Sequence, residues 1–151
     1  MTVTFFGHRD TPQNIEPRLL EVLRHLIENE SADLFYVGNQ GAFDRIVKSS
    51  LEELKIEYPH ISCYIILAYM PTKKNNDIPS TVETIYPDGL EKVPRRFAIS
   101  QRNKWMLTQS DTVITYVEYR SSGAGQFKEL AEKKGKRIIE LCTENLPTNI
   151  K

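Results

Sequence analysis

The sequence predicts an α/β fold, in which helices pack on both faces of a parallel β-sheet. Short apolar segments rich in β-branched and aromatic residues alternate along the chain with longer segments whose apolar residues recur at helical spacing. Two of the strand-like segments end at a glycine, Gly7 and Gly38, as expected where a strand turns into the next helix. Such alternation predicts right-handed βαβ connections and parallel strands.

The first part of the chain supplies three strands and two helices. Residues 2–6 are β-branched and aromatic and predict the first strand. Asp10, Thr11 and Pro12 supply the N-terminal signals of the helix that follows. The third strand-like segment is apolar almost throughout, which suits a central strand covered on both faces. We predict strands at 2–6, 34–37 and 61–69, and helices at 15–29 and 42–57.

Regular patterns resume only after a long irregular segment. Residues 70–96 contain prolines at positions 71, 79, 87 and 94, and Pro87, Asp88 and Gly89 mark a turn. A loop of this length in a compact domain is usually functional or mobile. Beyond it we predict helices at 97–109 and 126–134, and strands at 112–117 and 137–141.

These elements make a single domain spanning residues 1–151, with a long loop insertion at about 70–96. The 151 residues are enough to bury a core. The pattern is that of a Rossmann-like three-layer sandwich, whose five-stranded parallel sheet usually has the order 3-2-1-4-5. All its strands end at one edge, and open α/β sheets bind their ligands at that edge.

Composition and charge narrow the class of function. Lys and Arg together number 20, as do Asp and Glu, so the formal net charge is zero. This argues against a domain that holds nucleic acid through bulk electrostatics. The N-terminus lacks the apolar segment of a signal peptide, and no run reaches membrane-spanning length. We therefore expect a cytoplasmic protein with no membrane partner. Scattered histidines and the lack of a CxxC pair give no support for a metal site.

Two turns that contain glycine are candidates for binding a phosphate. One precedes the last predicted helix and the other precedes the second. Glycine lets the backbone approach a phosphate closely, and the N–H groups of a helix's first turn point at it. The alternative is that a strand-to-helix turn simply needs glycine. The ligand-binding candidates from these turns are Gly38, Asn39, Gly41, Ser121, Ser122, Gly123 and Gly125.

Further ligand-binding candidates lie at the ends of other strands. Gly7, His8 and Arg9 directly follow the first strand. His8 could transfer a proton or donate a hydrogen bond, and Arg9 could clamp a phosphate or carboxylate. The alternative is a solvated basic pair in a loop. Tyr69 and Tyr86, beside and within the long loop, are expected near the same pocket.

Arg102 and Glu129 are the candidates for catalysis. Arg102 shares a helix face with Ala98, Trp105 and Met106. An arginine within a packing face needs an anionic partner or a water-filled edge, or it extends to solvent from the rim of the core. Glu129 lies near the start of the last helix, where the alternative is an ordinary glutamate favoured by the helix dipole.

Several common motifs are missing. No Walker A sequence is present, which argues against ATP or GTP hydrolysis by a P-loop. The GxSxG motif of α/β-hydrolases is also absent. Gly7 is not part of a GxGxxG sequence, which argues against ordinary NAD-dependent dehydrogenase chemistry.

Four stretches of the chain are similar to a known superfamily. They are FFGHR at 5–9, YVGNQGAFD at 36–44, IYPDGLE at 85–91 and the segment 102–130. The pattern resembles the SLOG superfamily, which includes the Smf/DprA and LONELY GUY-like proteins, and within it the small YpsA-like proteins of bacteria. The resemblance spans nearly the whole chain and implies a Rossmann-like fold with a nucleotide-type ligand.

The LONELY GUY enzymes resemble the chain more distantly. They release the base from a cytokinin nucleoside monophosphate, with an RxxxM helix segment and a PGGxGTxxE loop. Arg102 and Met106 match the first motif, and Gly123, Gly125 and Glu129 match positions of the second. The resemblance implies that Arg102 holds and polarises the substrate, while Glu129 acts on the ribose or on an attacking water. The departures are Ser121 and Ser122 for Pro-Gly, and Gln126 for Thr.

The leading hypothesis is a protein that binds a nucleotide or nucleotide-derived ligand at the carboxyl edge of the sheet. Its catalytic form is a hydrolase of an N-glycosidic bond, related to the phosphoribohydrolases. The alternative is a non-catalytic nucleotide sensor that acts through a protein partner. A DNA-associated role is the third hypothesis, and the zero net charge argues against it. We expect no required cofactor or metal, and a homodimer is an open expectation by analogy with related folds.

Overall fold

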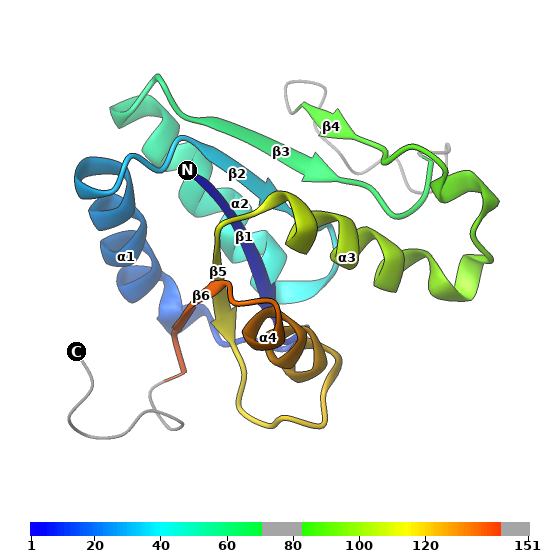
Figure 1. Cartoon of the computed structure of the whole chain (residues 1–151). Coiled ribbons are helices and arrows are strands. Elements are labelled where there is room, and N and C mark those ends of the chain that lie inside the picture. Colours follow the sequence, from blue (N-terminus) through cyan, green and yellow to red (C-terminus); the bar gives the residue numbers. More distant parts are fainter. Residues whose placement is uncertain (71–82, 143–151) are drawn as a thin grey trace.

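The computed structural model describes residues 1–70 and 83–142, which form one six-stranded sheet between two layers of helices (Figure 1). All five strand pairs are parallel, and the order is β4-β3-β2-β1-β5-β6. The carboxyl ends of the strands therefore share one edge. The strands are β1 Thr2–Gly7, β2 Leu34–Val37, β3 Ser62–Ile66, β4 Thr84–Ile85, β5 Thr112–Tyr116 and β6 Arg137–Glu140.

Helices connect these strands and cover both faces of the sheet. The α-helices are α1 Glu16–Asn29, α2 Gly41–Glu57, α3 Ala98–Gln109 and α4 Gly123–Lys133. Short 3-10 helices precede α1 and α3 or follow β4: η1 Gln13–Ile15, η2 Leu90–Lys92 and η3 Arg95–Phe97. Helices α2 and α4 are the next helices after β2 and β5 and begin at the carboxyl edge, so the first turns of both face that edge.

The two faces of the sheet have separate apolar cores. Successive residues of a strand point to opposite faces. Phe5 of β1 is buried in the core beneath α1 and α2, whereas Phe6 is buried in the core beneath α3 and α4. The first core is the larger, because α1 and α2 cover the centre of the sheet with regularly spaced leucines and isoleucines.

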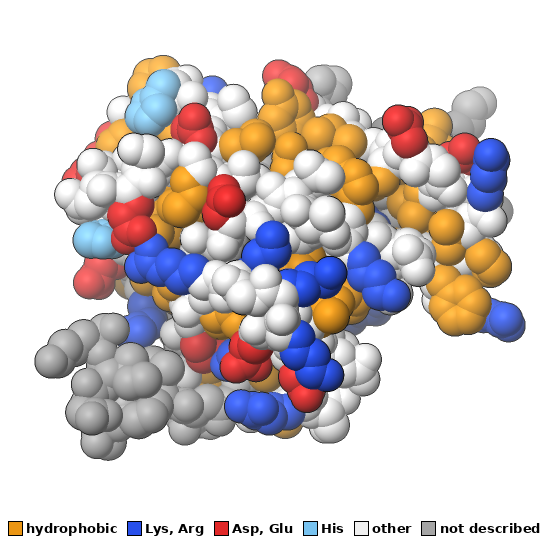
Figure 2. All heavy atoms as spheres, viewed as in Figure 1, with side chains coloured by type: hydrophobic (Ala, Val, Ile, Leu, Met, Phe, Trp, Pro, Cys, Tyr) orange, Lys and Arg blue, Asp and Glu red, His pale blue; other side chains and the backbone are white. Residues whose placement is uncertain are grey.

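The second face is covered less completely on the side of β3 and β4. Tyr36, Tyr64, Ile85 and Trp105 pack against the edge of the second core and stay partly exposed. Hydrophobic side chains gather above α3 in the space-filling view, over the part of the sheet that holds β3 and β4 (Figure 2). Among residues 1–70 and 83–142, no helix has the length and apolar character needed to span a membrane.

The α/β class and the parallel sheet are confirmed, but the predicted number of five strands is wrong. The sheet has a sixth strand, β4, which pairs with the carboxyl half of β3. The other five strands have the predicted order 3-2-1-4-5. Strand β4 holds only two residues within the proline-containing segment, so it is too short to produce a periodic pattern in the sequence.

The boundaries of other elements differ slightly from the prediction. Strand β3 ends at Ile66, although the apolar run continues to Tyr69. Helix α4 begins at Gly123, three residues earlier than predicted. Within the predicted loop at 70–96, residues 71–82 lie outside the described part of the chain. Residues 83–96 hold β4, η2 and the first part of η3.

Candidate functional site

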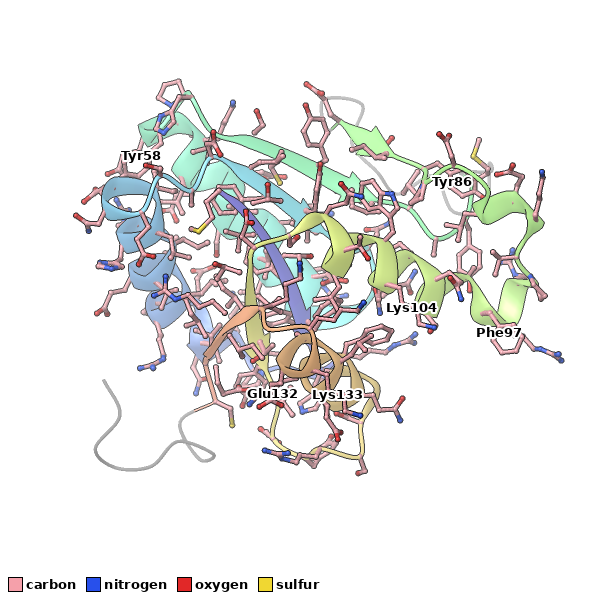
Figure 3. All side chains as sticks on the ribbon, viewed as in Figure 1. Tyr58, Tyr86, Phe97, Lys104, Glu132 and Lys133 are labelled. Carbon is pink, nitrogen blue, oxygen red and sulfur yellow. The ribbon has the colours of Figure 1, made fainter. Side chains whose placement is uncertain are left out.

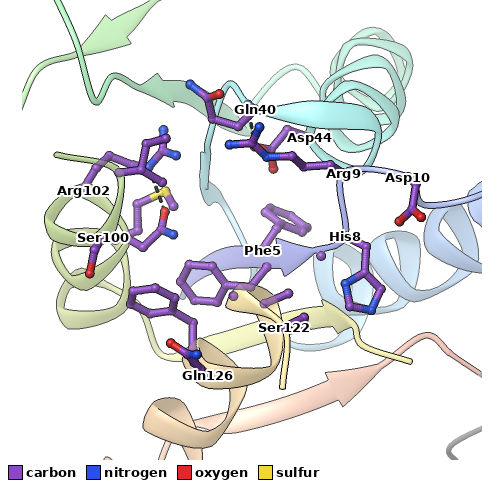
Figure 4. A pocket seen from close by; sticks show the side chains of 18 of the residues that line it. Phe5, His8, Arg9, Asp10, Gln40, Asp44, Ser100, Arg102, Ser122 and Gln126 are labelled. Atoms are coloured by element: carbon purple, nitrogen blue, oxygen red, sulfur yellow. Dashed lines mark hydrogen bonds between the residues drawn. The ribbon is translucent and has the colours of Figure 1, made fainter. Parts of the chain in front are cut away.

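A cavity of about 580 Å³ opens at the carboxyl edge of the sheet, beside the end of β1 (Figure 4). Its volume is within the usual range for small-molecule sites. Phe5, Phe6 and Gly7 of β1 contribute to its lining, and His8, Arg9 and Asp10 continue it. The starts of α2 and α4 form two further walls, and one side of α3 forms another. The cavity is therefore built where the topology brings loops together.

Arg102 of α3 supplies a buried positive charge to the cavity wall. Its side chain is only 2% exposed. Its Nη1 donates a hydrogen bond to the carbonyl oxygen of Ile66 at 2.9 Å, and its Nε donates to Oδ1 of Asn103 at 2.8 Å. Burial lowers the pKa of the guanidinium, and attraction to Asp44 and Tyr69 opposes that effect. These contacts fix the plane of the guanidinium at the end of β3.

Asp44, in the first turn of α2, faces Arg102 across the top of the cavity in Figure 4. Its Oδ2 accepts a hydrogen bond from the backbone N–H of Gln40 at 2.9 Å. Burial raises the pKa of this carboxyl group to about 6, although the Gln40 N–H and the charges of Arg102, Lys48 and Arg9 favour the ionised form. A half-buried carboxyl group with a raised pKa is common in functional sites.

Two glycines leave room for charged residues of the cavity: Gly38 for Asp44 and Arg102, and Gly41 for Arg9. A Cβ atom on Gly38 would lie 2.7 Å from Oδ2 of Asp44 and 3.3 Å from Cζ of Arg102. Gly41 has φ +84°, and a Cβ atom there would lie 2.7 Å from Cα of Arg9. Both glycines therefore shape the site, although neither is among the residues that line the cavity.

His8 links the ends of β1 and β5. Its side chain is buried, and its Nε2 accepts a hydrogen bond from the backbone N–H of Glu118 at 2.8 Å. This geometry requires the neutral ring with its proton on Nδ1. The ring stacks on Tyr119 at 4.5 Å between centroids. Because Nε2 already accepts this hydrogen bond, His8 is arranged as a structural link and as an Nδ1–H donor, rather than as a base acting through Nε2.

The start of α4 presents backbone donors to the cavity. Ser122 caps the helix: its Oγ accepts from the N–H of Gly125 at 3.0 Å and donates to the carbonyl oxygen of Tyr119 at 2.8 Å. The first helical hydrogen bond runs from the N–H of Gln126 to Ser122. Gly123 and Ala124 line the cavity, and the helix itself does not use their N–H groups. Such groups are suited to an anion.

The remaining walls combine further charge with aromatic surface. Arg9 and Arg96 both line the cavity and have exposed side chains. Phe127 of α4 lies against Phe6 with its centroid at 5.3 Å, and Tyr119 is half exposed at the rim. The site thus offers cations and backbone donors beside apolar rings, which suits an anionic ligand that also has a planar group.

The predicted ligand-binding residues divide into two groups. Those that line the cavity are Gly7, His8, Arg9, Ser122 and Gly123, together with the catalytic candidate Arg102. Those outside its lining are Gly38, Asn39, Gly41, Tyr69, Tyr86, Ser121 and Gly125, together with the catalytic candidate Glu129.

For three of the predicted residues outside the cavity lining, the structure shows where the side chain or residue lies instead. Tyr69 stacks under the guanidinium of Arg95 at 4.3 Å and donates from its hydroxyl to the Arg95 carbonyl oxygen at 3.4 Å. Tyr86 follows β4, far from α4 (Figure 3). Glu129 is exposed on α4. It follows Phe127 by two residues, which turns it about 200° around the helix from that cavity-lining side chain.

Sequence reasoning did not select several residues that line the cavity. Asp44 is the most informative of them, because its pKa depends on burial that no short motif reports. The available signal was its place three residues after Gly41, within the first turn of a helix that begins at a glycine-containing turn. The other unselected polar residues are Asp10, Gln40, Arg96, Ser100, Asn103, Tyr119 and Gln126.

No protein-family model matches the chain, and no curated protein matches its sequence. Its fold is similar to that of DNA processing protein A (DprA) from Streptococcus pneumoniae, with a TM-score of 0.64 and 14% sequence identity. The match covers 92% of this chain and 49% of the DprA chain, so the chain spans about half the length of that protein. At this identity the similarity shows the fold alone, which agrees with the Rossmann-like fold that the resemblance implied.

Proposed function

We propose that this chain binds a nucleotide or nucleotide-derived ligand in the cavity at the carboxyl edge of the sheet. The observation that carries the proposal is the composition of that cavity. The buried Arg102, two exposed arginines and the first-turn N–H groups of α4 all line the same 580 Å³ as the rings of Phe127 and Tyr119. A phosphate suits the cations and backbone donors, and a base suits the rings.

A thermal-shift screen tests the proposal. The panel holds nucleoside mono-, di- and triphosphates, NAD, ADP-ribose, cyclic dinucleotides and a short single-stranded oligodeoxynucleotide. A ligand present at one hundred times its Kd stabilises the fold by about 2.7 kcal/mol. We expect at least one nucleotide to raise the Tm. A folded protein that responds to no member of the panel contradicts the proposal.

Arg9 supplies the matched variant for the same screen. Arg9→Gln removes an exposed cationic side chain from the cavity wall, so we expect it to weaken nucleotide binding by about tenfold or more. Arg18→Gln is the control, because Arg18 is exposed on α1 and does not line the cavity. Equal affinities for the two variants would show that the ligand binds elsewhere.

Hydrolysis of an N-glycosidic bond is the catalytic extension of this proposal. The place of Arg102 in the cavity supports it, while the exposed position of Glu129 on α4 does not. The carboxyl groups that line the cavity are those of Asp10 and Asp44. If chromatography detects base release from a bound nucleotide, we expect Asp44→Asn to slow it and Glu129→Gln to leave it unchanged.

We also infer, from the resemblance of residues 5–9, 36–44 and 85–91, that the chain is a small SLOG-type protein of the YpsA-like kind. The name of the structural neighbour, DNA processing protein A, refers to DNA. The zero net charge of this chain favours a nucleotide over a nucleic acid held by bulk electrostatics. The oligodeoxynucleotide in the panel separates these two ligands.

A further inference from the structure

Asp44 has one hydrogen bond within the described residues, although its carboxylate can accept several. Oδ2 accepts from the Gln40 N–H at 2.9 Å. Among residues 1–70 and 83–142, no other group donates a hydrogen bond to this side chain, and no cation lies within ion-pair distance of it. Because Asp44 also lines the cavity, its remaining acceptor positions are available to a ligand there.

The Gln40 N–H and the space above Gly38 place the Asp44 carboxylate at the cavity wall. The side chain lies over Gly38, where a Cβ atom would come within 2.7 Å of Oδ2. Arg102, on the neighbouring helix, is also within 3.3 Å of that Cβ position and is fixed by Ile66 and Asn103. A carboxylate fixed at a cavity wall, and short of donors, suits a ligand that brings donors of its own.

The start of α4 forms the wall opposite Asp44. Figure 4 places Gln40 and Asp44 on one side of the cavity, and Ser122 and Gln126 at the start of α4 on the other. The start of α4 offers N–H donors, which suit an anion. A ligand that presents negative charge to α4 and hydroxyl or N–H donors to Asp44 therefore fits both walls.

We infer that the carboxylate of Asp44 binds the ribose hydroxyl groups of the nucleotide, so that the cavity selects ribonucleotides over 2′-deoxyribonucleotides. This inference rests on the proposed function, because it assigns one end of the ligand that the cavity is proposed to hold. A carboxylate that accepts from ribose hydroxyls is a common solution in Rossmann-like nucleotide sites. Here the carboxylate comes from the first turn of α2, beside the end of β2.

The test compares AMP, GMP, CMP and UMP with their 2′-deoxy counterparts by calorimetric titration at pH 8, where Asp44 is ionised. We expect wild-type protein to bind the preferred ribonucleotide at least about tenfold more tightly than its deoxy counterpart. Asp44→Asn should reduce that ratio to less than about threefold by weakening the ribonucleotide, since the amide replaces an acceptor by a donor. Asp88→Asn, at an exposed turn outside the cavity, should keep the wild-type ratio.

Each outcome bears on one of the two proposals. Equal affinity of wild-type protein for ribo- and deoxyribonucleotides overturns the inference and leaves the proposed function intact. An equal loss of both ligands in Asp44→Asn also overturns it, because the residue would then act on the whole site. Failure of the wild type to bind any of the eight monophosphates overturns the inference, whereas the proposed function is contradicted only if no nucleotide of the thermal-shift panel binds. The ratio of ribonucleotide to deoxyribonucleotide affinity is measured on wild-type protein, so it tests the inference even if Asp44→Asn does not fold.

Discussion

The ionised side chain of Asp44 lowers the stability of the folded protein. Its pKa rises from the ordinary value of 3.8 to about 6, with burial as the main cause. The folded protein therefore binds the Asp44 proton more tightly than the unfolded chain does. Above pH 6 the carboxylate is ionised in both states, and its burial lowers the free energy of unfolding. This cost disappears as the pH falls from about 6 to about 4.

Asp44→Asn removes this cost, so we expect the variant to be more stable than wild type at pH 8. A difference of about two pKa units corresponds to up to about 3 kcal/mol, and the loss of attraction to Arg102 reduces the gain. Denaturant unfolding at pH values between 4 and 8 measures it. The two curves should converge as the pH falls below 6. The exposed control Asp88→Asn should follow wild type within about 0.5 kcal/mol. A variant less stable than wild type at pH 8 would refute this explanation.

At the residue scale, the sequence predicted part of the site for a clear reason. The sequence indicates Gly7, Arg9 and Gly123 because they lie at the end of a strand or in the turn from a strand to a helix, and the topology brings these turns together. Glu129 was selected from a motif match, which reports spacing along the chain and not the face of the helix. Asp44 was not selected, since its character depends on burial beside Arg102, and these residues are far apart in the sequence.

At the scale of elements, Glu140 joins β5, β6 and α4. It is the last residue of β6 and its side chain is only 6% exposed. One carboxylate oxygen accepts from the Thr115 hydroxyl at 2.8 Å and the Lys128 ammonium at 2.8 Å. The other accepts from the backbone N–H groups of Val117 and Cys142, each at 2.9 Å. This carboxylate therefore fixes the chain as it leaves β5 toward the cavity.

Glu140→Gln should destabilise the fold by about 2–4 kcal/mol. The amide nitrogen replaces the oxygen that accepts from the Val117 and Cys142 N–H groups, so these two buried donors then face another donor. Lys128 also loses its ion pair. Urea unfolding measures the change. Glu132→Gln, on the exposed side of α4, is the control and should change stability by less than about 0.5 kcal/mol. A loss for Glu140→Gln as small as for the control would show that the four hydrogen bonds add little to stability.

The predicted elements differ from the observed ones where a local pattern was short or interrupted. Strand β4 has two residues, fewer than any periodic pattern needs. Helix α4 begins at Gly123 because the Ser122 hydroxyl caps it, whereas the glycines at 123 and 125 weaken a helix prediction there. The long helices α1 and α2 were predicted well, since their apolar faces repeat over several turns.

At the scale of the whole molecule, the parallel sheet determines where the site can form. All six strands point the same way, so the loops after β1, β2 and β5 meet at one edge beside α3. The sequence predicted this convergence from the alternation of strands and helices. It could not predict the depth of the cavity, because that depends on how α3 packs against β1 and how Arg102 and Asp44 share the space above Gly38.

The most direct test of the central claim is a ¹⁵N–¹H NMR titration with the nucleotide of the thermal-shift panel that binds most tightly. We predict that the largest shifts belong to the backbone N–H groups of Gln40, Gly123 and Ala124, which lie at the cavity. The N–H groups of Asn29 and Ile56, near the opposite ends of α1 and α2, should not move. Largest shifts at Asn29 and Ile56, or no saturable shift with any nucleotide of the thermal-shift panel, would contradict the assignment of this cavity as a nucleotide site.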